Sequence, residues 1–117
     1  MNTFKPEQID EALCVTPQVQ PEDMPAIAGA GIRSIINNRP DFEGGSGQPT
    51  SAQLEAAARS AGLQYRHLPV PPAGHTPEQA RSMVDAVDAM PQPVVAFCRS
   101  GRRSAAQCLW RSIRGNA

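Results

Sequence analysis

The feature that most constrains the fold of this chain is a short, uninterrupted apolar run, Val94–Phe97, followed by Cys98 and a loop that contains glycine. An apolar run of this length without alternation is typical of a β-strand covered on both faces. Such strands occur in parallel sheets that have helices packed on each side. The run therefore predicts a buried strand that delivers Cys98 to the edge of a sheet.

The rest of the chain alternates between strand-like and helix-like segments. We expect strands at residues 13–16, 32–37, 64–68 and 94–97, and helices at 21–29, 50–61, 76–90 and from 103 onward. Two capping-box patterns, at Thr50 and Thr76, mark helix starts, and Gly62 fits a left-handed helix stop. Residues 42–49 hold three glycines and predict a flexible surface loop. Residues 1–117 are therefore predicted to form a single α/β domain, with a mainly parallel sheet of four to five strands flanked by helices.

The composition narrows the expected partners. Eleven basic and eleven acidic side chains cancel, so no overall field favours nucleic acid or a membrane surface. The three cysteines are an odd number and lack Cys-x-x-Cys spacing, which argues against a disulfide framework or a zinc site, and we expect no metal or other cofactor. The first residues lack the apolar core of a signal peptide, which predicts a cytoplasmic location.

The loop after the apolar run has the features of an anion site. A strand that passes through a tight loop into a helix directs backbone N–H groups and the positive helix end at one spot. The same field stabilises a thiolate, so Cys98 is the expected nucleophile. Arg103 is the second expected catalytic residue, because its guanidinium offers a planar fork of donors to an oxyanion. The expected substrate-binding residues of the loop are Arg99, Ser100, Gly101, Arg102 and Ser104.

Two other segments are expected to reach this edge of the sheet. Arg39 and Asp41 follow the second strand, so they either face the substrate or form a salt bridge that braces their loop. His75 lies in the Pro/Gly-rich segment after the third strand, where it either binds substrate or is simply exposed. Cys14 and Cys108 occur among apolar residues and are expected to be small buried side chains that turnover does not need.

These residues resemble a known family, the beta-lactamase-hydrolase-like proteins with a phosphatase-like domain, which share a fold with the dual-specificity protein phosphatases. The resemblance covers nearly the whole chain and lies in Gln18 with 21–23, 31–32, 36–41 with Glu43, 48–49, 62–69 and 93–101. It implies a cysteine-phosphatase-like fold. Some members look like sulfurtransferases that work beside, or fused to, persulfide dioxygenases, and others have been regarded as phosphatases. The family loop usually has threonine at the position of Arg102.

Two observations favour sulfur transfer over phosphate hydrolysis. The spacing from Cys98 to Arg103 is Cys-x4-Arg, as short as a rhodanese loop, whereas the tyrosine-phosphatase signature is Cys-x5-Arg. Residues 69–75 hold no carboxylate to protonate a leaving alcohol, and sulfur exchange needs no such acid. We therefore expect a sulfurtransferase with a Cys98 persulfide. It would take sulfur from thiosulfate or glutathione persulfide and pass it to a thiol or cyanide. The family resemblance adds a persulfide dioxygenase as a partner to expect.

Two alternatives remain open on the sequence. In the first, the chain is a phosphatase of the tyrosine or dual-specificity type with Cys98 as its nucleophile, and Asp41 supplies the missing acid from another loop. In the second, the chain is a module that binds an anion or a persulfide without turnover.

Overall fold

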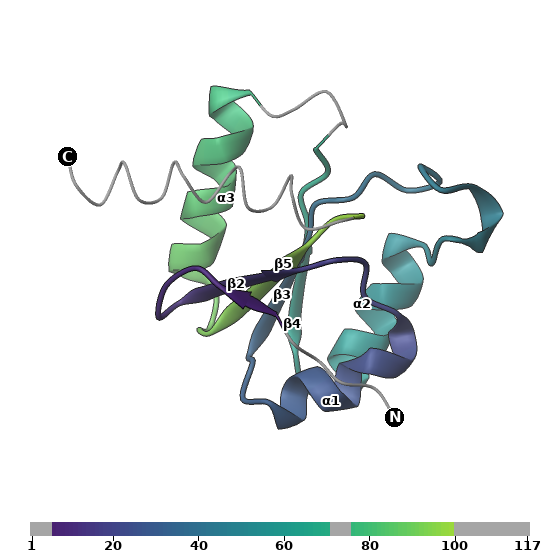
Figure 1. Ribbon diagram of the computed structural model, residues 1–117, viewed down its shortest axis with the longest axis horizontal. Helices are drawn as coiled ribbons and strands as arrows, with labels where there is room; N and C mark the ends of the chain where they lie inside the picture. Colours follow the sequence, from purple (N-terminus) through teal and green to yellow (C-terminus); the bar gives the residue numbers. More distant parts are fainter. Residues whose placement is uncertain (1–5, 71–75, 100–117) are drawn as a thin grey trace.

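Four parallel strands form the centre of the structure, a computed structural model that describes residues 6–70 and 76–99 (Figure 1). In spatial order they are β2 (Leu13–Thr16), β5 (Val94–Phe97), β3 (Ser34–Asn37) and β4 (Gln64–His67). A fifth strand, β1 (Glu7–Gln8), pairs with β2 in the antiparallel direction. This arrangement confirms the predicted α/β fold with a mainly parallel sheet. β1 is too short to leave a periodic signal in the sequence.

The carboxyl ends of the parallel strands lie level with one another. Phe97, the last residue of β5, pairs with Thr16 of β2 and with Asn37 of β3. Asn37 pairs in turn with His67 at the end of β4. Cys98 leaves the sheet at this common edge, which is where parallel α/β sheets bind their ligands.

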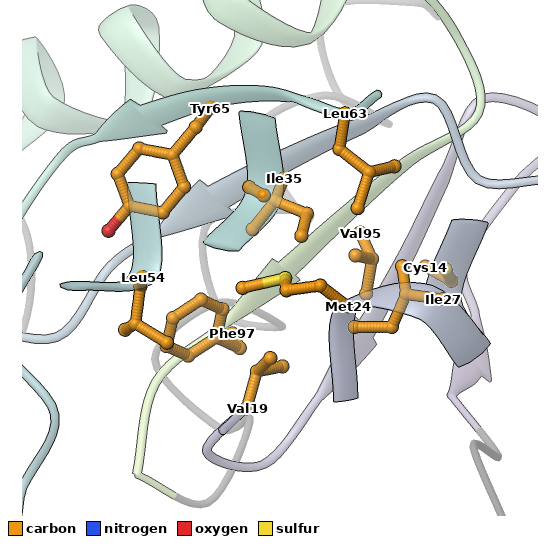
Figure 2. Packing of buried hydrophobic residues seen from close by; sticks show 11 residues of the cluster. Cys14, Val19, Met24, Ile27, Ile35, Leu54, Leu63, Tyr65, Val95 and Phe97 are labelled. Atoms are coloured by element: carbon orange, nitrogen blue, oxygen red, sulfur yellow. The ribbon is translucent and has the colours of Figure 1, made fainter. Parts of the chain in front are cut away.

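One face of the sheet packs against two helices, α1 (Met24–Gly29) and α2 (Ser51–Ser60). Phe97 and Val95 contribute to the core on this side (Figure 2). The helices contribute buried side chains that include Met24, Ile27, Leu54 and Ala58. The two helices therefore cover the strands that lead to the carboxyl edge.

The opposite face packs against α3 (Pro77–Ala89). Val94 and Ala96 of β5 point to this side, so successive β5 residues alternate between two apolar layers. The helix contributes Met83, Ala86 and Val87. Coverage on both sides explains why Val94–Phe97 is apolar at every position.

The helix ends follow the sequence patterns closely. At the start of α2, Thr50 Oγ1 accepts a hydrogen bond from the Gln53 backbone N–H at 3.2 Å, and Gln53 Oε1 accepts one from the Thr50 N–H at 2.9 Å. The same reciprocal pair opens α3 at Thr76, and Gly62 follows α2 with a φ of +83°. These capping boxes and this turn are confirmed.

Three expectations about the elements need correction or lie outside the described part of the chain. The helix expected at 21–29 begins as a 3-10 turn, Pro21–Asp23, before α1. The loop 42–49, expected to be irregular, contains a 3-10 turn at Gly45–Gly47. The helix expected from residue 103 onward, with Cys108, lies outside the described residues. Within residues 6–70 and 76–99, no helix is long and apolar enough to cross a membrane.

Cys14 of β2 is buried in the core, as expected for a small apolar side chain. Its Sγ lies 3.7 Å from the Val94 carbonyl oxygen, to which the thiol donates. Burial raises the pKa of the Cys14 thiol from 9.0 to about 11, because the core disfavours the thiolate. Cys14 therefore stays a neutral thiol at physiological pH.

The Thr50→Ala substitution should lower the free energy of unfolding by about 1 kcal/mol, because it removes the cap of α2. Ser60→Ala, at the other end of the same helix, is the control and should change stability by less than about 0.5 kcal/mol. Urea unfolding measures both. Equal losses in the two variants would contradict a specific role for the cap.

Cys14 also predicts a loss of stability at alkaline pH. The unfolded chain ionises this thiol near pH 9.0 and the folded chain near pH 11, so the folded state loses stability as the pH rises between these values. A Cys14→Ala variant should be less stable than the wild type at pH 7, but its stability should fall less between pH 9 and 11. Parallel slopes for the two proteins would contradict the raised pKa.

Candidate active site

Cys98 occupies the first position after β5 and is buried. The residues on either side of it are held by neighbouring loops. Before it, the Asn38 N–H donates to the Phe97 carbonyl oxygen at 2.8 Å. After it, the Gln18 N–H donates to the Arg99 carbonyl oxygen at 3.3 Å. The backbone that carries the thiol is therefore fixed by the segments that follow β3 and β2.

The Arg39 side chain lies in the loop that follows β3 and is largely buried. Its Nε donates to Glu43 Oε1 at 3.1 Å, and its Nη1 donates to Gln18 Oε1 at 2.9 Å. Because the Gln18 backbone binds the carbonyl of Arg99, these contacts connect Arg39 to the residue after Cys98. Arg39 was expected either to contact the substrate or to form a salt bridge that braces its loop. The contacts described here are those of a salt bridge that braces the loop, and direct contact with substrate stays a prediction.

The backbone of Arg39 is held as well. Its N–H donates to Asn37 Oδ1 at 2.8 Å, and its carbonyl oxygen accepts from His67 Nε2 at 2.8 Å. His67 is half-buried at the end of β4 and thereby joins the ends of two neighbouring strands. Backbone and side chain together tie Arg39 to three segments at the carboxyl edge.

The loop after Arg39 folds around its guanidinium. The Gly44 N–H donates to Gln48 Oε1 at 2.7 Å, and Gln48 Nε2 donates to the Pro40 carbonyl oxygen at 2.9 Å. A Cβ atom on Gly44 would lie 2.6 Å from Arg39 Nη2, so a side chain cannot be added there without displacing the guanidinium. The loop expected to be a flexible connection is thus closed by its own hydrogen bonds and by a close contact.

The Asp41 carboxylate lies at the start of α2. Its Oδ1 accepts a hydrogen bond from the Ser51 N–H, the first residue of the helix, at 2.8 Å. A negative charge at a helix N-terminus is favourable because it complements the helix dipole. The contact anchors the loop to α2, and a part for Asp41 in binding or protonating a substrate stays a prediction.

Three hydrogen-bonded polar side chains connect the end of β3 to β4 and to the start of α2. Asn37 Nδ2 donates to the Tyr65 hydroxyl at 2.8 Å, and the hydroxyl also lies 2.9 Å from Ser51 Oγ. Burial raises the pKa of Tyr65, so its hydroxyl is neutral. These hydrogen bonds could not be predicted from the sequence, because a tyrosine in a strand pattern is expected to be a core residue and its polar partners are distant in sequence.

A hollow of about 210 Å³ opens between the segment after β4 and the first turns of α3. It is lined by Leu68, Pro69, Val70, Glu78, Gln79 and Ser82. The Val70 N–H donates to the Asn38 carbonyl oxygen at 2.8 Å, which fixes this segment beside the loop after β3. Glu78 brings a carboxylate to the hollow that the pattern of residues 69–75 did not indicate.

Several expected site residues lie outside the described residues: Ser100, Gly101, Arg102, Arg103, Ser104 and His75. Arg99 is described and exposed. Among the histidine, cysteine, aspartate and glutamate side chains of residues 6–70 and 76–99, no group is placed to hold a metal ion.

Comparison with known proteins assigns the sequence that forms the sheet and carries Cys98 to one family. The family model of the phosphatase-like domain of beta-lactamase hydrolase-like proteins matches residues 7–114. The beta-lactamase hydrolase-like protein of Agrobacterium fabrum is 35% identical over 101 residues, which are 86% of this chain and 23% of that protein. Its counterpart from Xylella fastidiosa is 35% identical over 96 residues, which are 82% of this chain and 22% of that protein. The chain thus spans about a quarter of these relatives.

Solved structures agree with this assignment. A phosphatase-like protein of Neisseria meningitidis is 33% identical and superposes with a TM-score of 0.81, covering 88% of this chain and 72% of that one. Tk-PTP in its active form (15% identity, TM-score 0.62) covers 79% of this chain and 60% of its own. The catalytic core of the PP-IP phosphatase SIW14 of S. cerevisiae (13% identity, TM-score 0.64) covers 86% and 60%. The last two show the fold alone.

These comparisons overturn the expectation of a sulfurtransferase. The matched family domain and the related structures are phosphatase-like, and none of the proteins compared above carries the name of a sulfurtransferase. The physical reason for the error is that a loop of backbone N–H groups at a helix start binds phosphate oxygens and a persulfide alike, so its length does not select the chemistry.

The agreement extends from β1 to beyond the Cys98 loop and includes a relative of known structure at 33% identity. Fold and sequence therefore lead to the same assignment: this chain belongs to the beta-lactamase hydrolase-like family, and its residues 7–114 match the phosphatase-like domain of that family.

Proposed function

We propose that this chain is a cysteine-dependent phosphatase that hydrolyses phosphate monoesters through Cys98. The observation that carries the proposal is the position of Cys98, buried at the carboxyl end of β5 where the level ends of four parallel strands meet. That edge is where ligands bind in such sheets, and cysteine is a nucleophile that can take up a phosphoryl group. Membership of a phosphatase-like family supports the same chemistry.

The reaction would proceed in two displacements at phosphorus. The Cys98 thiolate attacks the phosphorus, an S–P bond forms, and the ester P–O bond breaks to release the alcohol, which gains a proton. Water then attacks the phosphocysteine, the S–P bond breaks, and inorganic phosphate leaves as the thiolate is restored. In this proposal, the backbone N–H groups of residues 99–104 and the Arg103 guanidinium hold the phosphate oxygens through both steps.

Arg39 would act as a positioning residue in this reaction. Its guanidinium contacts Glu43 and Gln18, and the Gln18 N–H holds the Arg99 carbonyl next to the nucleophile. The ion pair with Glu43 is largely shielded from water, with 10% and 16% of the two side chains exposed, so it is more strongly coupled than a surface pair. Displacing the guanidinium would leave buried charge and amide groups unpaired and would loosen the Cys98 backbone.

Cys98→Ser should abolish hydrolysis of phenyl phosphate while leaving the fold intact, because a serine hydroxyl is hardly ionised at neutral pH. Cys14→Ala is the matched control and should keep most of the wild-type rate, since Cys14 is a neutral core thiol. Released phosphate measures turnover, circular dichroism measures the fold, and rapid acid quenching followed by mass spectrometry detects phosphocysteine. Cys98-independent hydrolysis, or phosphate binding without turnover, would overturn the proposal.

Gly44→Ala should lower the free energy of unfolding by roughly 1–3 kcal/mol and reduce kcat/KM, because the new Cβ forces the Arg39 guanidinium away from its partners. Gly47→Ala places the same methyl group in the same loop with nothing within 4 Å, and should be nearly neutral in both measurements. Urea unfolding and phenyl phosphate kinetics test the pair. Equal effects at the two glycines would show that the close contact with Arg39 does not matter.

A further inference from the structure

Two consecutive asparagines are buried where β3 ends: Asn37, its last residue, and Asn38, which follows it. Asparagine is depleted in strands, and burying it is costly unless its amide is hydrogen-bonded. β3 lies between β4 and β5 and pairs with both (Figure 1). The backbone hydrogen bonds at its end therefore show what the two amides do.

On the side of β4, the asparagine amides replace a backbone hydrogen bond. In a parallel pair, successive residues of the middle strand bond alternately to its two neighbours. Asn37 bonds β4, because the Leu68 N–H donates to its carbonyl oxygen at 2.8 Å. In a regular ladder the Arg39 N–H would come next and donate to the Leu68 carbonyl oxygen. Instead, the Arg39 N–H donates to Asn37 Oδ1 at 2.8 Å. The Leu68 carbonyl oxygen accepts from Asn38 Nδ2 at 3.0 Å.

On the side of β5, the ladder ends at the carbonyl oxygen of Asn38. The Asn38 N–H donates to the Phe97 carbonyl oxygen at 2.8 Å, as the register requires. The next bond of a regular ladder would join the Arg99 N–H to the Asn38 carbonyl oxygen. That oxygen instead accepts the Val70 N–H at 2.8 Å, from the segment after β4. The sheet therefore leaves the Arg99 N–H, one residue after the nucleophile, outside its ladder.

The side chain of Asn38 holds this arrangement in place. The residue is fully buried. Its Nδ2 carries two hydrogens, and it lies 3.0 Å from the Leu68 carbonyl oxygen and 3.7 Å from Met83 Sδ of α3. The amide is thus oriented by two elements at once. Its contacts keep the Asn38 carbonyl turned toward Val70 and away from β5.

We propose that Asn38 is a positioning residue that ends both hydrogen-bond ladders of β3 and thereby keeps the Arg99 N–H for a phosphate oxygen. This inference rests on the proposed phosphatase function, in which backbone N–H groups from residue 99 onward hold the phosphate. It adds the residue that keeps the first of these groups out of the sheet. Asn38 acts through the backbone and does not itself touch the phosphate.

Without the amide, the regular ladder becomes available to the same backbone. The Leu68 carbonyl would take the Arg39 N–H, and the carbonyl of residue 38 would turn back toward Arg99. A phosphate oxygen would then compete with that carbonyl for one N–H. Losing one net hydrogen bond in this way corresponds to an affinity about two- to tenfold lower.

Two substitutions and a control separate this role from stability, all made in the Cys98→Ser protein, which binds without turnover. Asn38→Ala removes the amide, and Asn38→Thr removes it while keeping more of the side-chain volume. Ser34→Ala is the control, because Ser34 is also buried and its Oγ donates to a backbone carbonyl, that of Pro91, at 2.6 Å. Ser34 begins β3, at the end of the sheet opposite to Cys98. Its loss should therefore lower stability without affecting anion binding.

Calorimetric titration with inorganic phosphate should give an affinity about two- to tenfold lower in both Asn38 variants and unchanged in Ser34→Ala. In amide NMR spectra, phosphate should shift the Arg99 resonance strongly in the parent and in Ser34→Ala, and weakly in the Asn38 variants. A loss of stability alone would not produce this difference.

Equal affinities and equal Arg99 shifts in all four proteins would overturn the role of Asn38 and leave the phosphatase proposal untouched. A parent protein in which phosphate does not shift the Arg99 amide would overturn it as well. Absence of Cys98-dependent hydrolysis in the wild type would instead overturn the phosphatase proposal, while the binding series would still show whether Asn38 keeps the Arg99 N–H for an anion.

Discussion

The ion pair between Arg39 and Glu43 is the interaction on which the architecture of the carboxyl edge depends. It places a guanidinium in the middle of the loop after β3, and that group then organises Gln18, Gly44 and the loop around it. A buried pair of this kind adds little net stability, because taking both charges out of water offsets their attraction. What it supplies is a fixed geometry, since each remaining donor of the guanidinium must find a partner in a defined direction.

Local patterns in the sequence predicted most of the fold. The capping boxes at Thr50 and Thr76, the turn at Gly62 and the apolar run of β5 each depend on residues within a few positions of one another, and all are found as expected. Helix–strand alternation then leaves a parallel sheet as the natural arrangement. The brief β1 strand and the 3-10 turn ahead of α1 lie below the length at which periodicity carries information.

The candidate site could be predicted less completely, because its contacts are long-range. The position of Cys98 at the end of a buried strand could be predicted from its own neighbours. The orientation of Arg39 depends on Gln18, 21 residues earlier, and Tyr65 contacts Asn37 across 28 residues. The prediction of sulfur transfer was wrong for a related reason. The spacing from Cys98 to Arg103 describes the size of an anion cradle, whereas the phosphatase-like character is distributed over residues 7–114.

The two outer strands also bear on how copies of this chain meet one another. An edge strand exposes unpaired N–H and C=O groups, which invite pairing with a second molecule and eventual aggregation. On one side, β1 covers the margin of β2 with two exposed polar residues. On the other, β4 is four residues long and carries Gln64 and Arg66 exposed to solvent. Short, polar margins of this kind discourage sheet extension, so the apolar centre of the sheet can be strongly hydrophobic without making the chain prone to polymerise.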